Sequence, residues 1–200
     1  AFYEGEASLF EDKKIWAEGE KYRAEQGAHP VIFLSFKDVK QLTAEEAFEK
    51  LTTLVASEIG RYRESVEKGF ADADKRTSLL RTAARKPSRT ELGESLGLLA
   101  EAIDAHTGKK PVILIDEYDQ PITTASVNGF YDEMCAFMRV FLSGAMKDNA
   151  HCHLGIMTGV LRVAKEGILS GLNNLEVRTV FDAPFSQYFG FTEDEVETMA

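Results

Sequence analysis

Short continuous apolar runs, separated by longer segments with helical spacing, dominate the hydrophobic pattern of this chain. The runs VIFLSF (31–36), VILID (112–116) and HLGIMTG (153–159) predict strands that are buried on both faces. A weaker run, LEVRTVF (175–181), predicts a fourth strand. Because helical segments lie between these strands, the pattern favours right-handed crossovers and a mainly parallel sheet.

The predicted helices share an apolar stripe at helical spacing, and several open with a Ser or Thr followed three residues later by a Glu. That spacing is the capping box, in which side chains satisfy the free amides of the first turn. The interval 68–87 is less regular and is expected to mix a short helix with a polar loop. The expected helices are 8–26, one opened by Thr43 and Glu46, one opened by Ser88 and Glu91, 128–147, and one opened by Thr192 and Glu195.

The composition is that of a folded α/β protein. Two hundred residues suffice for one sizeable domain or two small ones, and 44% hydrophobic with 28% charged residues excludes disorder of the whole chain. A net charge of −10 argues against general attraction to nucleic acid or anionic membranes. No apolar run approaches the roughly 20 residues of a membrane span, no signal peptide is visible, and two cysteines suit a reducing cytosol. We therefore expect a cytoplasmic protein without a membrane partner.

The segment PVILIDEYDQP (111–121) runs from apolar residues directly into two adjacent carboxylates, Asp116 and Glu117. Burying both would be costly, so they are expected at the exposed end of the strand. An Asp there can hold Mg²⁺, usually through water. Because successive strand side chains alternate, Glu117 is expected to point away from Asp116 and to deprotonate a water for attack on a γ-phosphate. This pattern assigns cofactor and metal binding to Asp116 and catalysis to Glu117; the alternative is a strand that ends in a polar turn.

Other polar residues are expected at the same edge, because ligands bind outside the carboxyl ends of parallel strands. Ser35–Lys37 and Thr158-Gly159 follow the two neighbouring runs. Thr158 stands where P-loop ATPases place a residue that senses the γ-phosphate, so it is a second candidate for nucleotide binding. Arg162 is a catalytic candidate that could reach a phosphate or a neighbouring subunit's site, or it is a surface residue at a helix start.

A complete ATP site also needs a G-x-x-x-x-G-K-[ST] loop, whose amides and lysine hold the phosphates. The sequence contains none. Gly108-Lys109-Lys110 comes nearest, but it lacks the upstream glycine and the hydroxyl residue. The 200 residues are therefore not expected to form a complete ATP site by themselves.

Together these segments resemble the bacterial AAA-ATPase-like domain family. The resemblance covers nearly the whole chain and is most specific in IDEYDQPI and LRVAKEGILSGLNN. The matching stretches are VIFLSFKDVK (31–40), PVILIDEYDQPI (111–122), NGFYDEMCAFMRVFLSGAMKDN (128–149), TGVLRVAKEGILSGLNNLEVRTVFD (158–182) and YFGFTEDEV (188–196).

The resemblance implies a three-layer, P-loop NTPase-like α/β fold with a mainly parallel sheet, lacking its first (Walker A) strand. It implies that 1–185 form a partial AAA-ATPase-like domain and that 186–200 begin a following helical segment. Asp116 and Glu117 match the Walker B pair, and Thr158 matches the sensor residue. In the family, the Walker A loop lies N-terminal to Ala1, and a domain similar to PD-(D/E)XK nucleases commonly follows.

The expected function is therefore an ATPase core that needs its upstream loop, with ATP and Mg²⁺ as cofactors of the intact protein and neither bound tightly by this chain. Candidate partners are a second copy of the chain and, through a domain outside it, nucleic acid. The main alternative is a non-catalytic scaffold or interaction module with a degenerate NTPase fold. A metal-dependent nuclease using Asp116 and Glu117 is less favoured, because such sites need more acidic residues and a nearby Lys.

Two smaller features can be interpreted either as functional sites or as ordinary structural and surface residues. The set His151, Cys152, His153 and Cys135 could bind zinc, but alternate strand residues spread over two faces and the short paired spacings of zinc sites are absent. A group of basic residues could contact nucleic-acid phosphates, although a solvated helix face explains it more simply. These residues are Lys75, Arg76, Arg81, Arg85, Lys86 and Arg89.

Overall fold

The computed structural model describes residues 7–160, 172, 175–179, 182, 191 and 193–199. Three sequence predictions lie outside them: the candidate Arg162, the domain boundary at 185–186, and the cap at Thr192.

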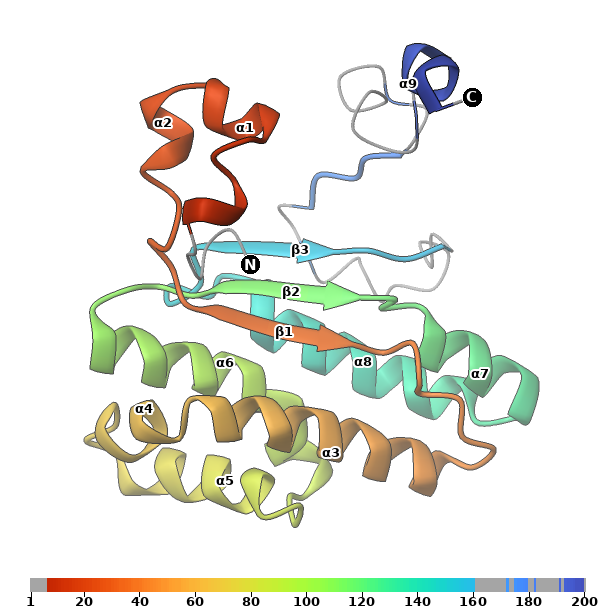
Figure 1. The fold of residues 1–200 in the computed structure, drawn as a ribbon. Coiled ribbons are helices and arrows are strands. Elements are labelled where there is room, and N and C mark those ends of the chain that lie inside the picture. Colours follow the sequence, from red (N-terminus) through yellow and green to blue (C-terminus); the bar gives the residue numbers. More distant parts are fainter. Residues whose placement is uncertain are drawn as a thin grey trace.

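Three strands form a parallel sheet, as the apolar runs predict. They are β1 (Val31–Ser35), β2 (Val112–Asp116) and β3 (Leu154–Met157), in the order β1-β2-β3. All three arrows point the same way in Figure 1, with β2 in the middle. The register sets Ser35 beside Asp116 and Ile115 beside Met157, so the carboxyl ends of the strands meet at one edge.

The longest helices cover one face of this sheet and form the core with it (Figure 1). These are α3 (Ala44–Arg61), α6 (Arg89–Thr107) and α8 (Tyr131–Met146). The others are η2 (Ala7–Leu9), α1 (Lys14–Ala17), α2 (Glu20–Arg23), α4 (Arg63–Lys68), α5 (Ala73–Ala83), α7 (Gln120–Asn128) and α9 (Glu193–Met199). None of the helices within the described ranges is long and apolar enough to cross a membrane.

The opposite face of the sheet is less covered. Residues Phe33, Leu154 and Ile156 are 48%, 41% and 43% exposed. Figure 1 shows α1 and α2 on this side, toward the amino ends of the strands. The sheet is therefore flanked by helices as expected, but within the described part of the chain only short helices lie on this side.

The helix predicted over 8–26 is wrong, because this stretch forms three short pieces. Lys13 is extended (ψ 153°) and precedes α1, while Gly19 (φ +105°) adopts a conformation that favours glycine and separates α1 from α2. Neither α1 nor α2 contains a buried residue. Short helices are marginal without packing of an apolar face, so nothing holds this stretch in one continuous helix.

The helix predicted over 128–147 also differs, because it is preceded by a helix that the sequence pattern did not indicate. Gly129 (φ +82°) ends α7 in a left-handed conformation, so α8 starts only at Tyr131. Pro121 lies in the first turn of α7, where its missing amide costs no helical hydrogen bond. The polar turn considered as the alternative covers only 117–119, and Gln120 and Pro121 already belong to a helix.

Two strand predictions need correction. Neither β1 nor β3 is buried on both faces, since Phe33 of β1 is exposed, and so are Leu154, Gly155 and Ile156 of β3. The fourth strand predicted over 175–181 is absent from 175–179, and the last two residues lie outside the described range. There the Thr179 amide donates to the Asp182 carboxylate and the Asp182 amide donates to the Thr179 carbonyl. Such local bonds compete with strand pairing.

The outer edge of β1 is closed by side chains of α3 and the residue after it. The Tyr62 hydroxyl accepts from the Val31 amide (3.0 Å) and donates to the Val31 carbonyl (2.7 Å). The Phe33 amide donates to Glu58 Oε1 at 3.0 Å, and Arg61 donates to the same oxygen at 2.8 Å. Because these groups occupy the hydrogen-bonding edge, another strand cannot pair there. Within the described ranges, the sheet can extend only beyond β3.

We expect Glu58→Gln to destabilise the fold by about 1 kcal/mol, because the charge-assisted bonds to Phe33 and Arg61 become neutral ones. The side chain is 7% exposed, so water does not replace the lost interaction. Urea unfolding at neutral pH measures the change. Glu49→Gln is the matched control, since Glu49 is exposed on the same helix. Equal stabilities of the two variants would contradict the edge-closing role.

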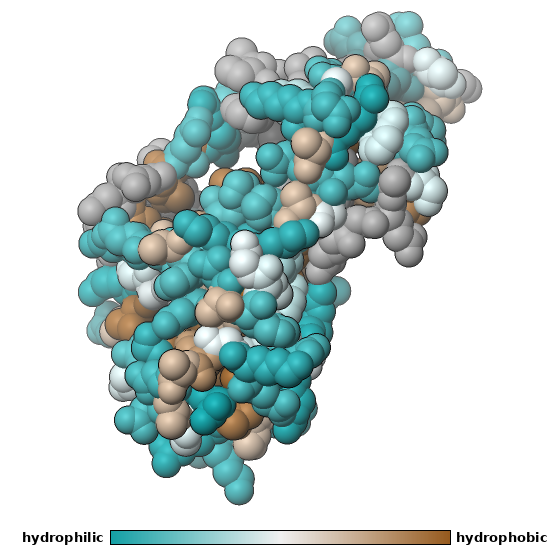
Figure 2. All heavy atoms as spheres, turned by 90° about the vertical axis from the view of Figure 1, so that its left-hand side faces the viewer, coloured by the Kyte–Doolittle hydropathy of each residue, from teal (hydrophilic) through white to brown (hydrophobic). Residues whose placement is uncertain are grey.

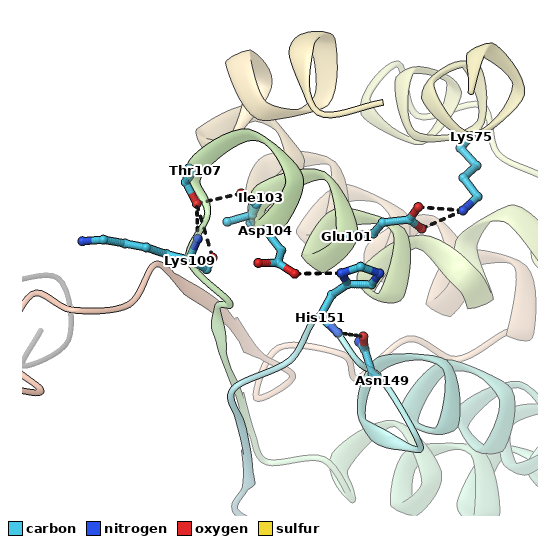
Figure 3. Close-up of polar contacts among 8 residues, drawn as sticks. All are labelled: Lys75, Glu101, Ile103, Asp104, Thr107, Lys109, Asn149 and His151. Atoms are coloured by element: carbon cyan, nitrogen blue, oxygen red, sulfur yellow. Dashed lines mark hydrogen bonds and ion pairs between the residues drawn. The ribbon is translucent and has the colours of Figure 1, made fainter. Parts of the chain in front are cut away.

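Polar contacts on α6 position neighbouring segments (Figure 3). The Lys75 ammonium lies 2.7 Å from Glu101, which joins α5 to α6. On the same helix, Asp104 lies 2.8 Å from His151 Nδ1, and Asn149 accepts from the His151 amide at 3.0 Å. The loop before β3 is thereby tied to the helix under the sheet, which places the start of β3.

Candidate functional site

The residues at the carboxyl end of the sheet converge on Asp116. As the last residue of β2, Asp116 lies between the two outer strands. The Thr158 hydroxyl donates to Asp116 Oδ1 at 2.5 Å, and the Ser35 hydroxyl lies 3.4 Å from Oδ2. Both carboxylate oxygens therefore meet a hydroxyl from a neighbouring strand. The structure brings together three of the residues that the sequence places at this edge.

Backbone hydrogen bonds continue the sheet past its assigned ends and hold this arrangement. The Phe36 amide donates to the Asp116 carbonyl at 2.9 Å, and the Thr158 amide donates to the Ile115 carbonyl at 2.9 Å. The Tyr118 amide in turn donates to the Thr158 carbonyl at 3.0 Å. The positions of the hydroxyls follow from strand register rather than from a flexible loop, so the cluster is preorganised.

The backbone of Glu117 does not continue the strand, although the alternation of side chains was predicted on that basis. Its φ of +53° is in the left-handed region, and β2 ends at the preceding residue. Pleat alternation therefore does not decide where its side chain points, and the predicted reason for its separation from Asp116 is wrong. The carboxylate is partly exposed and has no hydrogen bond or ion pair with any described residue. A non-glycine residue in this conformation costs about 1–3 kcal/mol, and such strain is concentrated at functional sites.

A contact that the sequence pattern did not reveal holds the turn after Thr158. Asp119 is 5% exposed, and its Oδ2 accepts from the Val160 amide at 3.2 Å. A Cβ added to Gly159 would lie 2.7 Å from Asp119 Oδ1 and 2.7 Å from a ring carbon of Tyr118. Only glycine fits this approach. The sequence signal that could have indicated this contact is the occurrence of Tyr118-Asp119 after the acidic pair together with Thr158-Gly159 after the next strand.

The other candidates are located as follows. Arg162 lies outside the described residues, so its position relative to Asp116 stays a prediction. Gly108 ends α6 in a left-handed conformation (φ +69°), and the two lysines after it lead into the amino end of β2. The Gly-Lys-Lys segment is thus a helix end at the edge opposite Asp116, not a phosphate-binding loop.

The cysteine and histidine set considered for zinc does not gather. Cys135 is buried in α8, while His151 pairs with Asp104. Burial raises the pKa of the Cys152 thiol, which disfavours the thiolate that a metal would need.

Several of the basic residues considered for nucleic acid are engaged with acidic ones. Lys75 pairs with Glu101, Arg81 with Glu91, and Arg89 with Glu133. Their charges are partly neutralised on the protein itself, which favours the solvated-face interpretation.

A family model described as "Predicted AAA-ATPase" matches residues 1–169, which include all three strands and the Asp116 cluster. The chain belongs to this family. It is also similar to an "Uncharacterized protein in vnfD 5'region" of Azotobacter chroococcum mcd 1, at 30% identity over 116 residues. No solved structure matches the chain.

The similarity to the Azotobacter protein covers 58% of this chain and 22% of that protein. The chain thus spans about a fifth of the length of this relative. Family membership agrees with the resemblance seen in the motifs. The nuclease-like domain that the resemblance also implies stays a prediction, as do the roles of individual site residues.

Proposed function

We propose that this chain supplies the Walker B and sensor strands of an ATP-hydrolysing core, and that a phosphate-binding loop from outside these 200 residues completes the site. The observation that carries the proposal is Asp116 at the carboxyl end of the central strand, with hydroxyls of Ser35 and Thr158 on its two oxygens. In open parallel sheets this edge is where ligands bind.

The donor set at this edge fits Mg²⁺. The groups at Asp116 are a carboxylate and two hydroxyls, all hard oxygen ligands that suit this ion better than a softer metal. In the proposal, Asp116 would hold the ion directly or through water, and the chemistry supplied there would be neutralisation of charge on the phosphates. The Ser35 and Thr158 hydroxyls would orient the carboxylate, and Thr158 would sense the γ-phosphate.

Glu117 would act as the general base. Its carboxylate is without a described partner and adjoins the metal-binding Asp116, so it is available to accept a proton from an attacking water. The left-handed backbone at Glu117 (φ +53°) sets the direction of this side chain independently of the strand. Arg162, three residues after Gly159, would stabilise negative charge that develops on the transferred phosphoryl group.

The sheet geometry supports a position beside β3 for the strand that would carry the phosphate-binding loop. The β1 edge is closed by Glu58 and Tyr62, whereas β3 pairs only with β2 within the described ranges. A further parallel strand can therefore join only beside β3. Its carboxyl end would then lie next to Thr158, so a loop at that end would face Asp116 across the sensor residue.

A non-catalytic scaffold is the second candidate. One observation favours it: the hydroxyls of Ser35 and Thr158 already satisfy both oxygens of Asp116 without a metal ion. In that case the cluster would only stabilise the sheet edge. ATP turnover by the full-length protein separates the two functions.

The 200-residue chain is expected to bind Mg-ATP no tighter than micromolar, because it lacks the amides and lysine that hold the phosphates. Calorimetric titration of this chain measures the affinity. The full-length protein encoded by the same gene is the control and should both bind and hydrolyse ATP, with turnover lost when EDTA removes Mg²⁺. Sub-micromolar binding by the chain alone would contradict the division of the site, and a full-length protein without turnover would favour the scaffold.

A further inference from the structure

A second cluster lies at the opposite end of the sheet, before the strands begin. It consists of Glu25, which follows α2, His29, which precedes β1, and His153, which precedes β3. One ligand atom from each side chain lies within 4.8 Å of the others. None of these residues takes part in the Asp116 site, and they are brought together only by the fold.

The spacing of these atoms suits a metal ion. His29 Nε2 lies 3.5 Å from Glu25 Oε2, and His153 Nε2 lies 3.8 Å from the same oxygen. An ion with bonds of about 2.0–2.1 Å to nitrogen and oxygen places tetrahedral ligands roughly 3.3–3.4 Å apart. The two separations exceed this by a few tenths of an ångström, so the three side chains are close to the distances that a shared ion requires.

The tautomer of His29 prepares one ligand. Its Nδ1 lies 2.8 Å from the Lys110 carbonyl oxygen, which can only accept, so Nδ1 carries the proton. In the neutral ring, the lone pair is then on Nε2, the atom that faces Glu25. A backbone carbonyl that fixes the second nitrogen in this way is the usual support of a metal-binding histidine.

The carboxylate of Glu25 also favours a bound cation. Its Oε2 is shielded from solvent and has no hydrogen-bond partner in the described part of the chain. A buried acceptor without a partner is costly, and here it faces the lone-pair nitrogen of His29. A cation between the two atoms removes both unfavourable features. Protonation of a histidine ring is the competing solution and becomes an outcome of the test.

We propose that Glu25, His29 and His153 bind a divalent transition-metal ion of the zinc type, with a fourth position for water or an external ligand. Two imidazoles and one carboxylate form a ligand set that zinc uses in open sites. The two rings are stacked, with centroids 3.7 Å apart and planes 13° apart, so binding turns them until both lone pairs converge.

The ion would fasten the N-terminal segment to the sheet. Helices α1 and α2 contain no buried residue, so core packing does not hold them in place. A bond network from the end of α2 to the starts of β1 and β3 would replace that packing, since metal-binding free energy is also folding free energy. Figure 2 looks onto the amino-end side of the sheet and shows a mainly hydrophilic surface. The side chains of Glu25 and His153, 44% and 39% exposed, leave the site accessible to an ion from solution.

Zinc titration of the metal-free 200-residue chain tests the site. We expect one ion per chain by calorimetry and a higher unfolding temperature with zinc. His153→Ala should weaken binding by at least about 10–100-fold, the loss typical of changes that only perturb a ligand's support. Glu25→Gln preserves side-chain shape and should also weaken binding, which guards against misfolding of the alanine variant. Bound Co²⁺ should show the visible absorption of four-coordinate nitrogen and oxygen ligands.

Two control variants distinguish binding by the cluster from binding at another histidine or at the neighbouring thiol. His106→Ala removes a histidine that is not part of the cluster and whose ring is hydrogen-bonded to Ser65. Cys152→Ser removes the thiol next to His153 in the sequence. Both should bind zinc as the unaltered chain does. Absence of binding would overturn the proposal in favour of a protonated histidine beside Glu25. Binding that survives His153→Ala and Glu25→Gln but fails in Cys152→Ser would assign the ion to the thiol and also overturn it.

Discussion

Replacing Glu117 by glutamine in the full-length protein is expected to lower ATP turnover by about 10²–10⁴-fold, the range that a general base contributes. The amide has the shape of the carboxylate but cannot accept a proton from water. The cost of the left-handed backbone at φ +53° is similar for both residues, so the local fold should persist. Because Asp116 and Thr158 are unchanged, nucleotide binding should remain. Steady-state turnover and nucleotide affinity, measured on the same preparation, separate the two effects.

Glu94→Gln is the matched control, because Glu94 is exposed on α6 and distant in sequence from the acidic pair. It should leave turnover unchanged. Equal, non-zero rates for Glu117→Gln and the unaltered protein would remove Glu117 from the mechanism. Loss of nucleotide affinity together with turnover would instead assign Glu117 to binding.

Adding a methyl group at Gly97 is expected to destabilise the fold by about 1–3 kcal/mol, the usual cost of overpacking a core. Gly97 lies on α6, where a Cβ would come within 2.5 Å of the Gly144 carbonyl oxygen on α8. The obstacle is backbone, so the two helices must separate. Both helices cover the sheet that carries Asp116 (Figure 1), so their separation would loosen the core beneath the site. Urea unfolding of Gly97→Ala measures the change.

Gly60→Ala makes the same chemical change in open space. Gly60 lies near the end of α3, and nothing lies within 4 Å of its added Cβ. Alanine should stabilise this helix by roughly 0.5–1 kcal/mol relative to glycine. The difference between the variants isolates the helix contact from intrinsic helix propensity. A Gly97→Ala variant as stable as Gly60→Ala would show that α6 and α8 are not packed as closely as the structure has them.

Signals that act over three or four residues were sufficient to predict several elements. The Ser88 and Glu91 side chains form the full reciprocal capping box of α6, as the spacing predicts. Thr43 accepts from the Glu46 amide at the start of α3, which confirms the first half of its box. These interactions depend only on neighbouring residues, so tertiary context does not alter them.

Predictions failed where burial or backbone conformation depended on distant neighbours. The apolar run of β3 is the same whether both of its faces are covered or one is open, and periodicity alone cannot decide between them. The left-handed backbone of Glu117 is likewise not indicated by its residue type. In the segment 8–26, regular apolar spacing had no packing partner to hold it in a helix, since α1 and α2 bury nothing.

By itself, the sequence determined the three parallel strands, two capped helices and the polar residues at one sheet edge, because these follow from local periodicity and from the rule that parallel strands end together. Only the tertiary structure decided which groups meet. It closes β1 with Glu58 and Tyr62, sets Asp119 against Gly159, and joins Glu25 to His153 across more than 100 residues. Contacts between residues so far apart in the sequence depend on how the helices pack against the sheet, and a local sequence pattern does not determine this packing.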